Sequence, residues 1–362
     1  MLASVLKPVD DTRMFEKIGT TLADSGQFEV SIIGYPSTGS STHPEIKFYP
    51  LPSFERLSFK RLVAPWIIFK RINQVKPELI MINTPELLLV AILNRIFFGR
   101  KIVYDVLENH YQNIRYTSGL PWLARHIIAF VVRIAEIFTS PLFYHYILAE
   151  KGYADEMRFA RPNIVLQNKL PKSVALKFTA KNVRGYTTLV FSGTLATSTG
   201  VFEAILLCKQ LHKVDNTYSL TIVGHCALPE VLKKIKKEIY DLSFITLIGG
   251  EALVPHSRIL EEISKADMGI IIYPPNPSTK SSIPTKLFEY LALQLPILIR
   301  HNEESHQLVS ECAAGIVLSE APDYIKLSAT LQTKRFAPTV PDSIYWESEV
   351  QNFIVRLKLG HL

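Results

Sequence analysis

The stretch YPPNPSTKSSIPTKLFEYLALQLP at residues 273–296 decides the fold, because it joins an apolar strand to a loop and a helix. The strand ends near Ile272, and the loop that follows it is rich in proline and serine. The helix begins near Pro284, whose fixed φ suits the first position of a helix. We expect Ser281 or Ser282 to cap it, since serine accepts hydrogen bonds from the amide groups of the first turn.

Two charged residues lie near the start of this predicted helix, Lys286 in the first turn and Glu289 one turn later. The backbone amide groups and the positive end of a helix favour phosphate, and Lys286 can add a cationic contact. A carboxylate at Glu289 can accept hydrogen bonds from both vicinal hydroxyls of a ribose. The alternative is a surface pair of Lys286 and Glu289 on an ordinary capped helix.

Apolar runs rich in β-branched residues recur along the chain, with helix-period segments such as 13–25 and 86–98 between them. The runs occupy residues 30–33, 79–82, 101–104, 146–148, 188–191, 220–223, 244–247, 268–272 and 297–299. Strands that alternate with helices indicate βαβ units on a parallel sheet. We therefore predict an α/β fold with two Rossmann-like, doubly wound domains facing a cleft. Ligands of such sheets bind at the carboxyl ends of the strands, which we expect to line that cleft.

A polar, basic segment without periodicity at 172–186 is the predicted linker. Residues 1–171 then form an N-terminal domain. Residues 187–344 form a C-terminal domain. Residues 345–362 carry apolar residues at helical spacing and form a last helix, which can pack back on either domain, the N-terminal one included.

The composition excludes several classes of protein. With 48% hydrophobic and 20% charged residues, the chain is neither disordered nor fibrous. Charged residues and proline interrupt the most apolar region, 120–150, so no run approaches the roughly 18–20 apolar residues of a membrane span. The first residues lack the pattern of a signal peptide, and the three widely separated cysteines favour a reducing compartment. These two features predict a cytoplasmic protein. We expect no metal or cofactor, because CxxC and HExxH motifs are absent.

Positive charge is concentrated in the first half of the chain. Residues 1–175 carry 21 Lys and Arg against 15 Asp and Glu, a net charge of +6, whereas the rest carries +1. Within 54–76, basic residues alternate with aromatic and aliphatic ones, and Glu55 is the single acid. This mixture suits an anionic membrane surface, although Pro65 interrupts a helix there and the apolar residues can equally belong to the core. No nucleic-acid recognition motif is present.

Two further polar residues of the first half have alternative interpretations. His110 can act as a general base or contact a phosphate, since histidine titrates near neutrality, or it can be an ordinary loop residue. Arg13 can reach an anionic ligand across the cleft, or it can form an ion pair with Glu16 or Glu150.

The segment PTKLFEYLA at 284–292, followed by Pro296 and an apolar strand, resembles the nucleotide-sugar motif of GT-B glycosyltransferases, in particular the large family-four group. Other segments resemble that family in the same order along the chain. They are residues 11–30, 103–108, 148–153, 190–200, 220–224 and 266–270. The resemblance covers nearly the whole chain and implies the GT-B fold.

The family's functional residues can be carried over position by position. Glu289 matches the second Glu of the E-x7-E motif, which binds the donor ribose. The resemblance also implies a diphosphate held by Gly193, Thr194, Ser282, Ile283, Pro284 and Lys286, and a base near Gly250 and Val254. It implies a reaction centre near Asp105, Glu108 and His110, and an acceptor or cleft contact at Asp11 and Arg13.

Four positions depart from the family's pattern. Ser281 stands where the first Glu of E-x7-E is expected, and Leu107 stands where a His is common. Thr194 and Thr199 stand where members often carry Arg and Lys. Charge-assisted contacts are the stronger ones, so the loss of two cations weakens a diphosphate site.

The resemblance implies a glycosyltransferase of the hexosyltransferase type, retaining and independent of metal. It would move a sugar from a nucleoside-diphosphate donor, UDP favoured over GDP, to a hydroxyl of a glycan or lipid-linked acceptor. The resemblance implies that residues 187–344 bind the donor and that residues 1–171 bind the acceptor. The expected setting is cell-surface polysaccharide assembly, in the cytoplasm or peripherally on the inner face of the cell membrane. Two alternatives stay open: a non-catalytic partner protein that keeps the fold, favoured by the four departures, and a sugar-nucleotide epimerase on the same fold.

Overall fold

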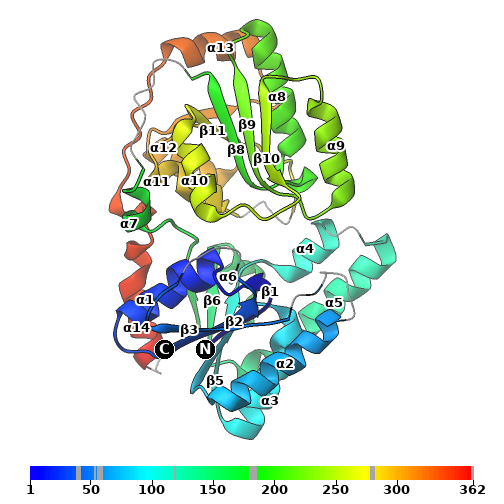
Figure 1. Cartoon of the computed structure of the whole chain (residues 1–362), viewed down its shortest axis with the longest axis vertical. Coiled ribbons are helices and arrows are strands. Elements are labelled where there is room, and N and C mark those ends of the chain that lie inside the picture. The colour runs from blue at the N-terminus through cyan, green and yellow to red at the C-terminus, as the bar shows by residue number, and fades with distance from the viewer. Residues whose placement is uncertain are drawn as a thin grey trace. The chain divides into compact units, whose positions relative to one another are not determined.

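The computed structural model describes residues 1–37, 42–52, 54, 60–117, 120–178, 186–277 and 282–359. The chain forms two compact units. The first comprises Met1–Asn168 together with Glu349–Leu362, and the second comprises Lys169–Ser348. Each unit is built around one parallel sheet with helices on its two faces (Figure 1). The predicted α/β fold with two Rossmann-like, doubly wound sheets is confirmed.

The sheet of the first unit has seven strands in the order β3-β2-β1-β4-β5-β6-β7. The strands are β1 (Leu2–Pro8), β2 (Val30–Tyr35), β3 (Ile46–Pro50), β4 (Leu79–Ile82), β5 (Lys101–Val106), β6 (His145–Leu148) and β7 (Asn163–Val165). All neighbouring strands are parallel. The order reverses between β1 and β4, where chain connections leave in opposite directions.

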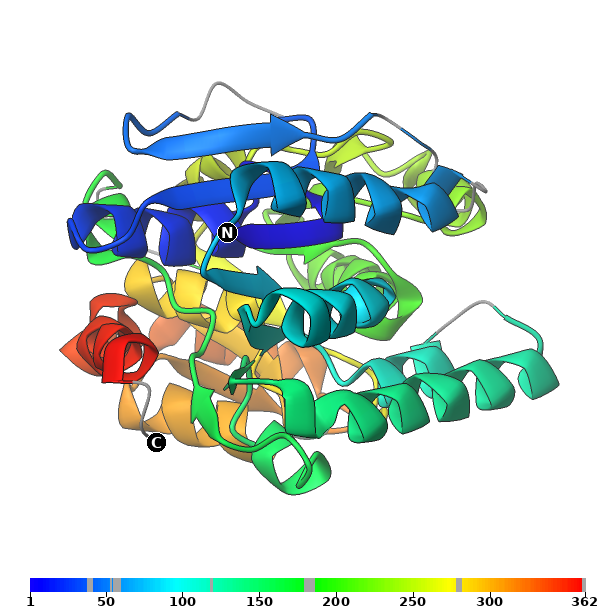
Figure 2. The same cartoon turned by 90° about the horizontal axis from the view of Figure 1, so that it is seen from below.

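Helices cover both faces of this sheet. They are η1 (Thr12–Gly19), α1 (Thr20–Asp24), α2 (Lys60–Val75), η2 (Pro85–Leu87), α3 (Leu88–Phe98), α4 (His110–Thr117), α5 (Trp122–Thr139), η3 (Ser140–Leu142) and α6 (Tyr153–Glu156). Helices α2, α3 and α5 lie side by side on one face, with α3 in contact with both others, and η1 and α1 lie on the opposite face (Figures 1 and 2).

The sheet of the second unit has six parallel strands in the order β10-β9-β8-β11-β12-β13. The strands are β8 (Thr188–Thr194), β9 (Ser219–His225), β10 (Ile245–Gly250), β11 (Met268–Ile271), β12 (Ile297–Arg300) and β13 (Gly315–Leu318). The helical segments are α7 (Lys172–Ala175), η4 (Thr197–Thr199), α8 (Val201–Val214), α9 (Pro229–Ile239), α10 (His256–Lys265), α11 (Thr285–Ala292), α12 (Glu303–Glu311), α13 (Tyr324–Thr333) and η5 (Asp342–Ile344). The order reverses between β8 and β11.

Each apolar run of the sequence coincides with a strand, because parallel strands covered by helices on both faces are apolar throughout. The runs miss β1, β3, β7 and β13. Strand β1 contains Ser4 and Lys7, and β3 lies at the edge of the sheet, where polar residues are tolerated. Strands β7 and β13 have three and four residues, which is too short for a periodic signal.

Two segments outside the sheets bear on the predicted boundaries. Helix α7 lies within the predicted linker 172–186, of which 179–185 fall outside the described residues. The last helix, α14 (Glu347–Leu359), begins two residues after the start of the predicted one, and its residues from Glu349 group with the first unit. Across the described ranges, no helix is both long enough and apolar enough to cross a membrane.

Candidate functional site

The reversal of strand order between β8 and β11 marks the position where doubly wound sheets bind ligands, beyond the carboxyl ends of the strands. Gly193, the penultimate residue of β8, has φ +95°, a conformation that favours glycine. Gly200 has φ +85°, and a Cβ there would lie 2.2 Å from the carbonyl oxygen of Ile272. The loop after β8 therefore lies directly against the end of β11.

Helix α11 follows the loop that leaves β11. Pro284 is its N-cap residue, with φ −58° and ψ 136°, and its side chain makes no capping hydrogen bond. Ser282 is not the N-cap residue that we expected, because the helix begins at Thr285 and Pro284 holds the N-cap position, and Ser281 lies outside the described residues. Ile283 is buried, and Ser282 is half-buried. A proline at the N-cap has no side-chain acceptor, so it does not itself occupy the amide donors that an anion can use.

Lys286 is buried in the first turn of α11, with 6% of its surface exposed. Its Nζ lies 3.9 Å from the centre of the Phe191 ring and 5.4 Å from that of Tyr273. Within the described part of the chain, this Nζ has no hydrogen-bond partner. Burial lowers the pKa of Lys286 to about 7, against the opposing effect of Glu289. A Cβ on Gly193 would lie 3.8 Å from Lys286 Cε, so the glycine turn and the lysine are neighbours.

Glu289 lies one turn further along α11, where it is 8% exposed. Its Oε1 lies 3.0 Å from Nε2 of His256, the first residue of α10. The sequence offered no partner for His256, because the two residues are 33 positions apart. Its only sequence signal is that it follows Val254, which the family resemblance places near the base, by two positions.

The remaining predicted donor residues lie at the carboxyl ends of β8 and β10. The Thr194 carbonyl accepts a hydrogen bond from Thr199 Oγ1 at 2.8 Å, and that hydroxyl also donates to the Ala196 carbonyl. Thr199 therefore holds the glycine loop together. Gly250 ends β10, and Val254 packs so closely on Gly249 that a Cβ there would lie 2.3 Å from it.

In the first unit, Arg13 and Asp105 form a buried ion pair, with 2% and 1% of their surfaces exposed. Arg13 Nη2 donates to Asp105 Oδ1 at 2.7 Å, and Nε donates to Oδ2 at 2.9 Å. Arg13 Nη1 also donates to the Leu166 carbonyl at 2.9 Å. The alternative that Arg13 forms an ion pair with Glu16 or Glu150 is wrong. The guanidinium instead reaches the carboxyl end of β5, where it binds both oxygens of Asp105.

The other predicted residues of the first unit lie at the starts of helices or on the surface. Asp11 is the N-cap of η1, and its Oδ1 accepts from the amides of Arg13 and Met14 at 3.0 Å each. Glu108 is exposed and accepts a hydrogen bond from Asn113 Nδ2 at 2.5 Å. His110 is the first residue of α4, and its buried Nε2 has no partner among the described residues.

Two buried polar residues, Asn83 and Thr84, were missed by sequence reasoning. They follow β4, next to the reversal of strand order in the first sheet. The side-chain amide of Asn83 and the Thr84 hydroxyl have no hydrogen-bond partner among the described residues, and the two side chains are 3% and 6% exposed. Buried polar atoms are normally paired, so these three atoms are suited to a polar ligand. The signal in the sequence was their position directly after an apolar run.

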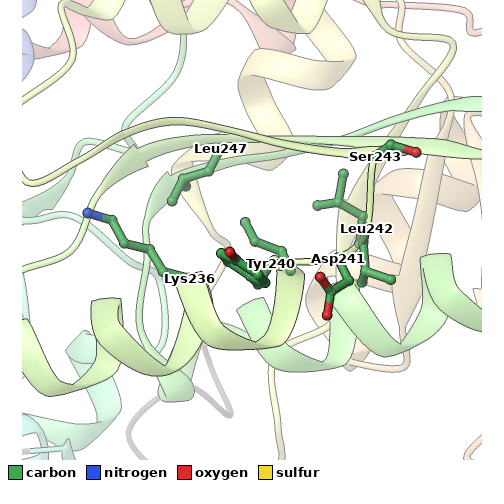
Figure 3. Close-up of a pocket in the computed structure, with 8 residues that line it drawn as sticks. Lys236, Tyr240, Asp241, Leu242, Ser243 and Leu247 are labelled. Atoms are coloured by element: carbon green, nitrogen blue, oxygen red, sulfur yellow. The ribbon is translucent and has the colours of Figure 1, made fainter.

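A surface pocket of about 650 Å³ lies elsewhere in the second unit (Figure 3). It is lined by the end of α9 and the start of β10, including Lys236, Tyr240 and Leu247. This is the opposite end of β10 from Gly250. None of the predicted site residues lines the pocket.

Comparisons with known proteins place the fold. No family model matches the chain, and a search of curated proteins found no match. A sucrose-phosphate synthase from Thermosynechococcus elongatus has a similar structure, with TM-score 0.70 and 11% identity, covering 99% of this chain and 97% of that one. The glycosyltransferase WaaG of lipopolysaccharide biosynthesis has TM-score 0.66 and 13% identity, covering 100% and 97%. Starch synthase IV from Arabidopsis thaliana, bound to ADP and acarbose, has TM-score 0.61 and 9% identity, covering 99% and 98%. The chain has the GT-B fold, as the resemblance implied.

Proposed function

We propose that this chain is a glycosyltransferase that moves a sugar from a nucleoside-diphosphate donor to an acceptor hydroxyl. The observation that carries the proposal is the amine of Lys286, buried at the start of α11 without a hydrogen-bond partner in the described part of the chain. A buried cation without a partner is costly, and a diphosphate supplies that partner. Several enzymes of similar structure use nucleotides, as the ADP bound to the starch synthase illustrates.

The second unit is proposed to hold the donor. The diphosphate lies on the N-terminus of α11 beside Lys286 and the Gly193 turn, and Glu289 accepts hydrogen bonds from the ribose. As the bond to the sugar breaks, negative charge builds on the departing diphosphate. The helix end and Lys286 stabilise that charge because they are already in place before the reaction. We further propose that the donor is a UDP-sugar, that the anomeric configuration is retained and that no metal is required, as the family resemblance implies.

The first unit is proposed to bind the acceptor. Asn83, Thr84 and His110 offer polar atoms without partners among the described residues, which suits the hydroxyl groups of a sugar. We propose a glycan or lipid-linked acceptor and a role in cell-surface polysaccharide assembly. The enzyme would then work in the cytoplasm, at the inner face of the cell membrane.

A second candidate function is that of a non-catalytic partner protein. The Arg13–Asp105 ion pair favours it, because both oxygens of a residue expected near the reaction centre are already engaged. Such a protein would bind nucleotide without transferring or hydrolysing the sugar. An epimerase, by contrast, would turn over the sugar nucleotide without any acceptor.

The donor site is tested by calorimetry with UDP, GDP and ADP. We expect one of them to bind the unmodified chain, and Lys286→Met and Glu289→Ala to weaken that binding by about tenfold or more, since each removes a contact to a charged or hydroxylated ligand. Lys326→Met is the matched control, because Lys326 is an exposed lysine of α13. It should bind as the unmodified chain does.

The outcome separates the candidate functions. Binding that depends on Lys286, together with release of nucleotide from the matching sugar nucleotide that requires an added acceptor, supports a transferase. Turnover of the sugar nucleotide without any acceptor supports an epimerase. Binding without turnover supports the partner protein. If no nucleoside diphosphate binds the unmodified chain, the donor site does not exist.

A further inference from the structure

Most of the exposed large apolar side chains that the structure describes lie on α2, α3 and α5 of the first unit. Leu62 on α2, Phe97 on α3 and Phe138 on α5 are 73%, 71% and 77% exposed. Trp66 and Trp122 are also more than half exposed. Single exposed apolar residues are ordinary, but a concentration on neighbouring helices marks an interaction surface.

The three helices form one continuous surface. Helix α3 contacts α2 on one side and α5 on the other, and the three lie next to each other in two perpendicular views (Figures 1 and 2). Their inner sides are buried, as Ile68, Val90 and Ala129 illustrate. Each helix is therefore apolar both on its inner side and on its outer side. We call the outer side of the three helices the α2–α3–α5 face.

All but one of the charged residues on these helices are basic. Lys70, Arg71 and Arg95 are exposed, and Arg125 and Arg133 of α5 are half-buried. Within the sequences of the three helices the only acidic residue is Glu136. It is 1% exposed and accepts a hydrogen bond from the Tyr104 hydroxyl at 3.2 Å. The α2–α3–α5 face thus combines aromatic and aliphatic side chains with basic ones, and the one carboxylate of the three helices is buried beneath it.

We propose that the α2–α3–α5 face docks on an anionic lipid bilayer. Aromatic and aliphatic side chains enter the boundary between headgroups and acyl chains, and basic side chains are attracted to anionic headgroups. A second copy of the chain fits less well, because a two-fold symmetric contact would bring two basic faces together. The inference extends the membrane-side reaction proposed above. It rests on the first unit alone, so its test is independent of the donor site.

The test is flotation of the full chain with vesicles of phosphatidylcholine, with and without phosphatidylglycerol. We expect the chain to float with the anionic vesicles and not with phosphatidylcholine alone. Phe97→Ser/Phe138→Ser and Lys70→Glu/Arg95→Glu should each weaken that binding by about tenfold or more. The matched control is Ile325→Ser, since Ile325 is 72% exposed on α13 of the second unit, and it should bind as the unmodified chain does.

Two results would overturn the proposal. One is an unmodified chain that fails to bind anionic vesicles. The other is a dimer, detected by light scattering, that Phe97→Ser/Phe138→Ser converts to a monomer while vesicle binding is unchanged. Thermal unfolding and nucleotide calorimetry of the same variants check that they fold. Vesicle binding in a chain that binds no nucleotide would refute the donor site and leave the docking face standing.

Discussion

The Lys286 ammonium group lies among aromatic rings, and burial lowers its pKa to about 7. A diphosphate bound beside it favours the protonated form, so binding takes up a proton wherever the free lysine is neutral. We predict that nucleotide affinity is highest at and below about pH 7 and falls above it, approaching about tenfold per pH unit. Calorimetry between about pH 7 and pH 9, in buffers of different ionisation heat, measures both the affinity and the proton uptake.

Lys286→Met provides the control for this pH dependence. The variant should bind weakly, and its affinity should be nearly constant across the same pH range, because it lacks the titrating amine. An unmodified chain whose affinity does not change above pH 7 would contradict the prediction.

Single residues also set the limit of what the sequence could predict about the site. Lys286 and Glu289 were predicted because they lie three positions apart on one helix beside a recognisable loop. His256 was not predicted as the partner of Glu289, because the contact joins two helices and leaves no pattern in either. Asn83 and Thr84 were missed for a related reason, since burial decides their importance and the sequence does not show it.

The Arg13–Asp105 pair acts on the scale of secondary-structure elements, since it fastens η1 to the end of β5 and to the Leu166 carbonyl after β7. We predict that Asp105→Asn destabilises the chain by about 3–5 kcal/mol, because it leaves a buried guanidinium without its carboxylate. Urea unfolding measures the loss.

The double variant Arg13→Met/Asp105→Leu tests the physical cause of that loss. It removes both charges and should recover most of the stability, since apolar residues often replace a buried ion pair at little cost. An Asp105→Asn chain as stable as the unmodified one would refute the role of the pair. Activity of Asp105→Asn is informative only after its stability is known.

At the same scale, the sequence predicted the strands more accurately than the ends of the helices. The runs at 79–82 and 297–299 identify buried strands because helices cover both of their faces. The predicted start of α11 near Pro284 agrees with the structure, but we expected a serine as its N-cap residue. Pro284 has an extended ψ of 136° and is itself the cap residue, which the preference of proline for the first helical turn did not reveal.

On the scale of the whole molecule, the chain returns to the first unit at its C-terminal end, where α14 belongs to the same unit as residues 1–168. Phe353 is fully buried, and Arg356 contributes to lowering the pKa of His145 on β6, after the larger effect of burial. We predict that Phe353→Ala costs about 3–5 kcal/mol, the usual cost of a cavity of that size. Hydrogen exchange should show lost protection in β1, β4 and β5, while β8, β9 and β11 keep theirs.

Val355→Ala is the matched control on the same helix, because Val355 is 49% exposed. It should leave protection unchanged in both sheets. Loss of protection in β8, β9 and β11 after Phe353→Ala would mean that α14 stabilises the second unit instead.

The architecture of two doubly wound sheets could be predicted because the alternation of apolar runs and helical segments occurs in both halves of the chain. The unit to which α14 belongs could not be predicted from the sequence. An amphipathic helix at 345–359 specifies that one side is buried, but not which unit buries it.

The division of the chain has a consequence for synthesis on the ribosome. The second unit, Lys169–Ser348, is one uninterrupted piece inserted into the first. Its residues all emerge before Glu349, so it can complete its sheet while the first unit still lacks its last helix. The half of the protein that is translated first is therefore the half that finishes folding last, and until α14 arrives the side that will bury Phe353 stays open to chaperones.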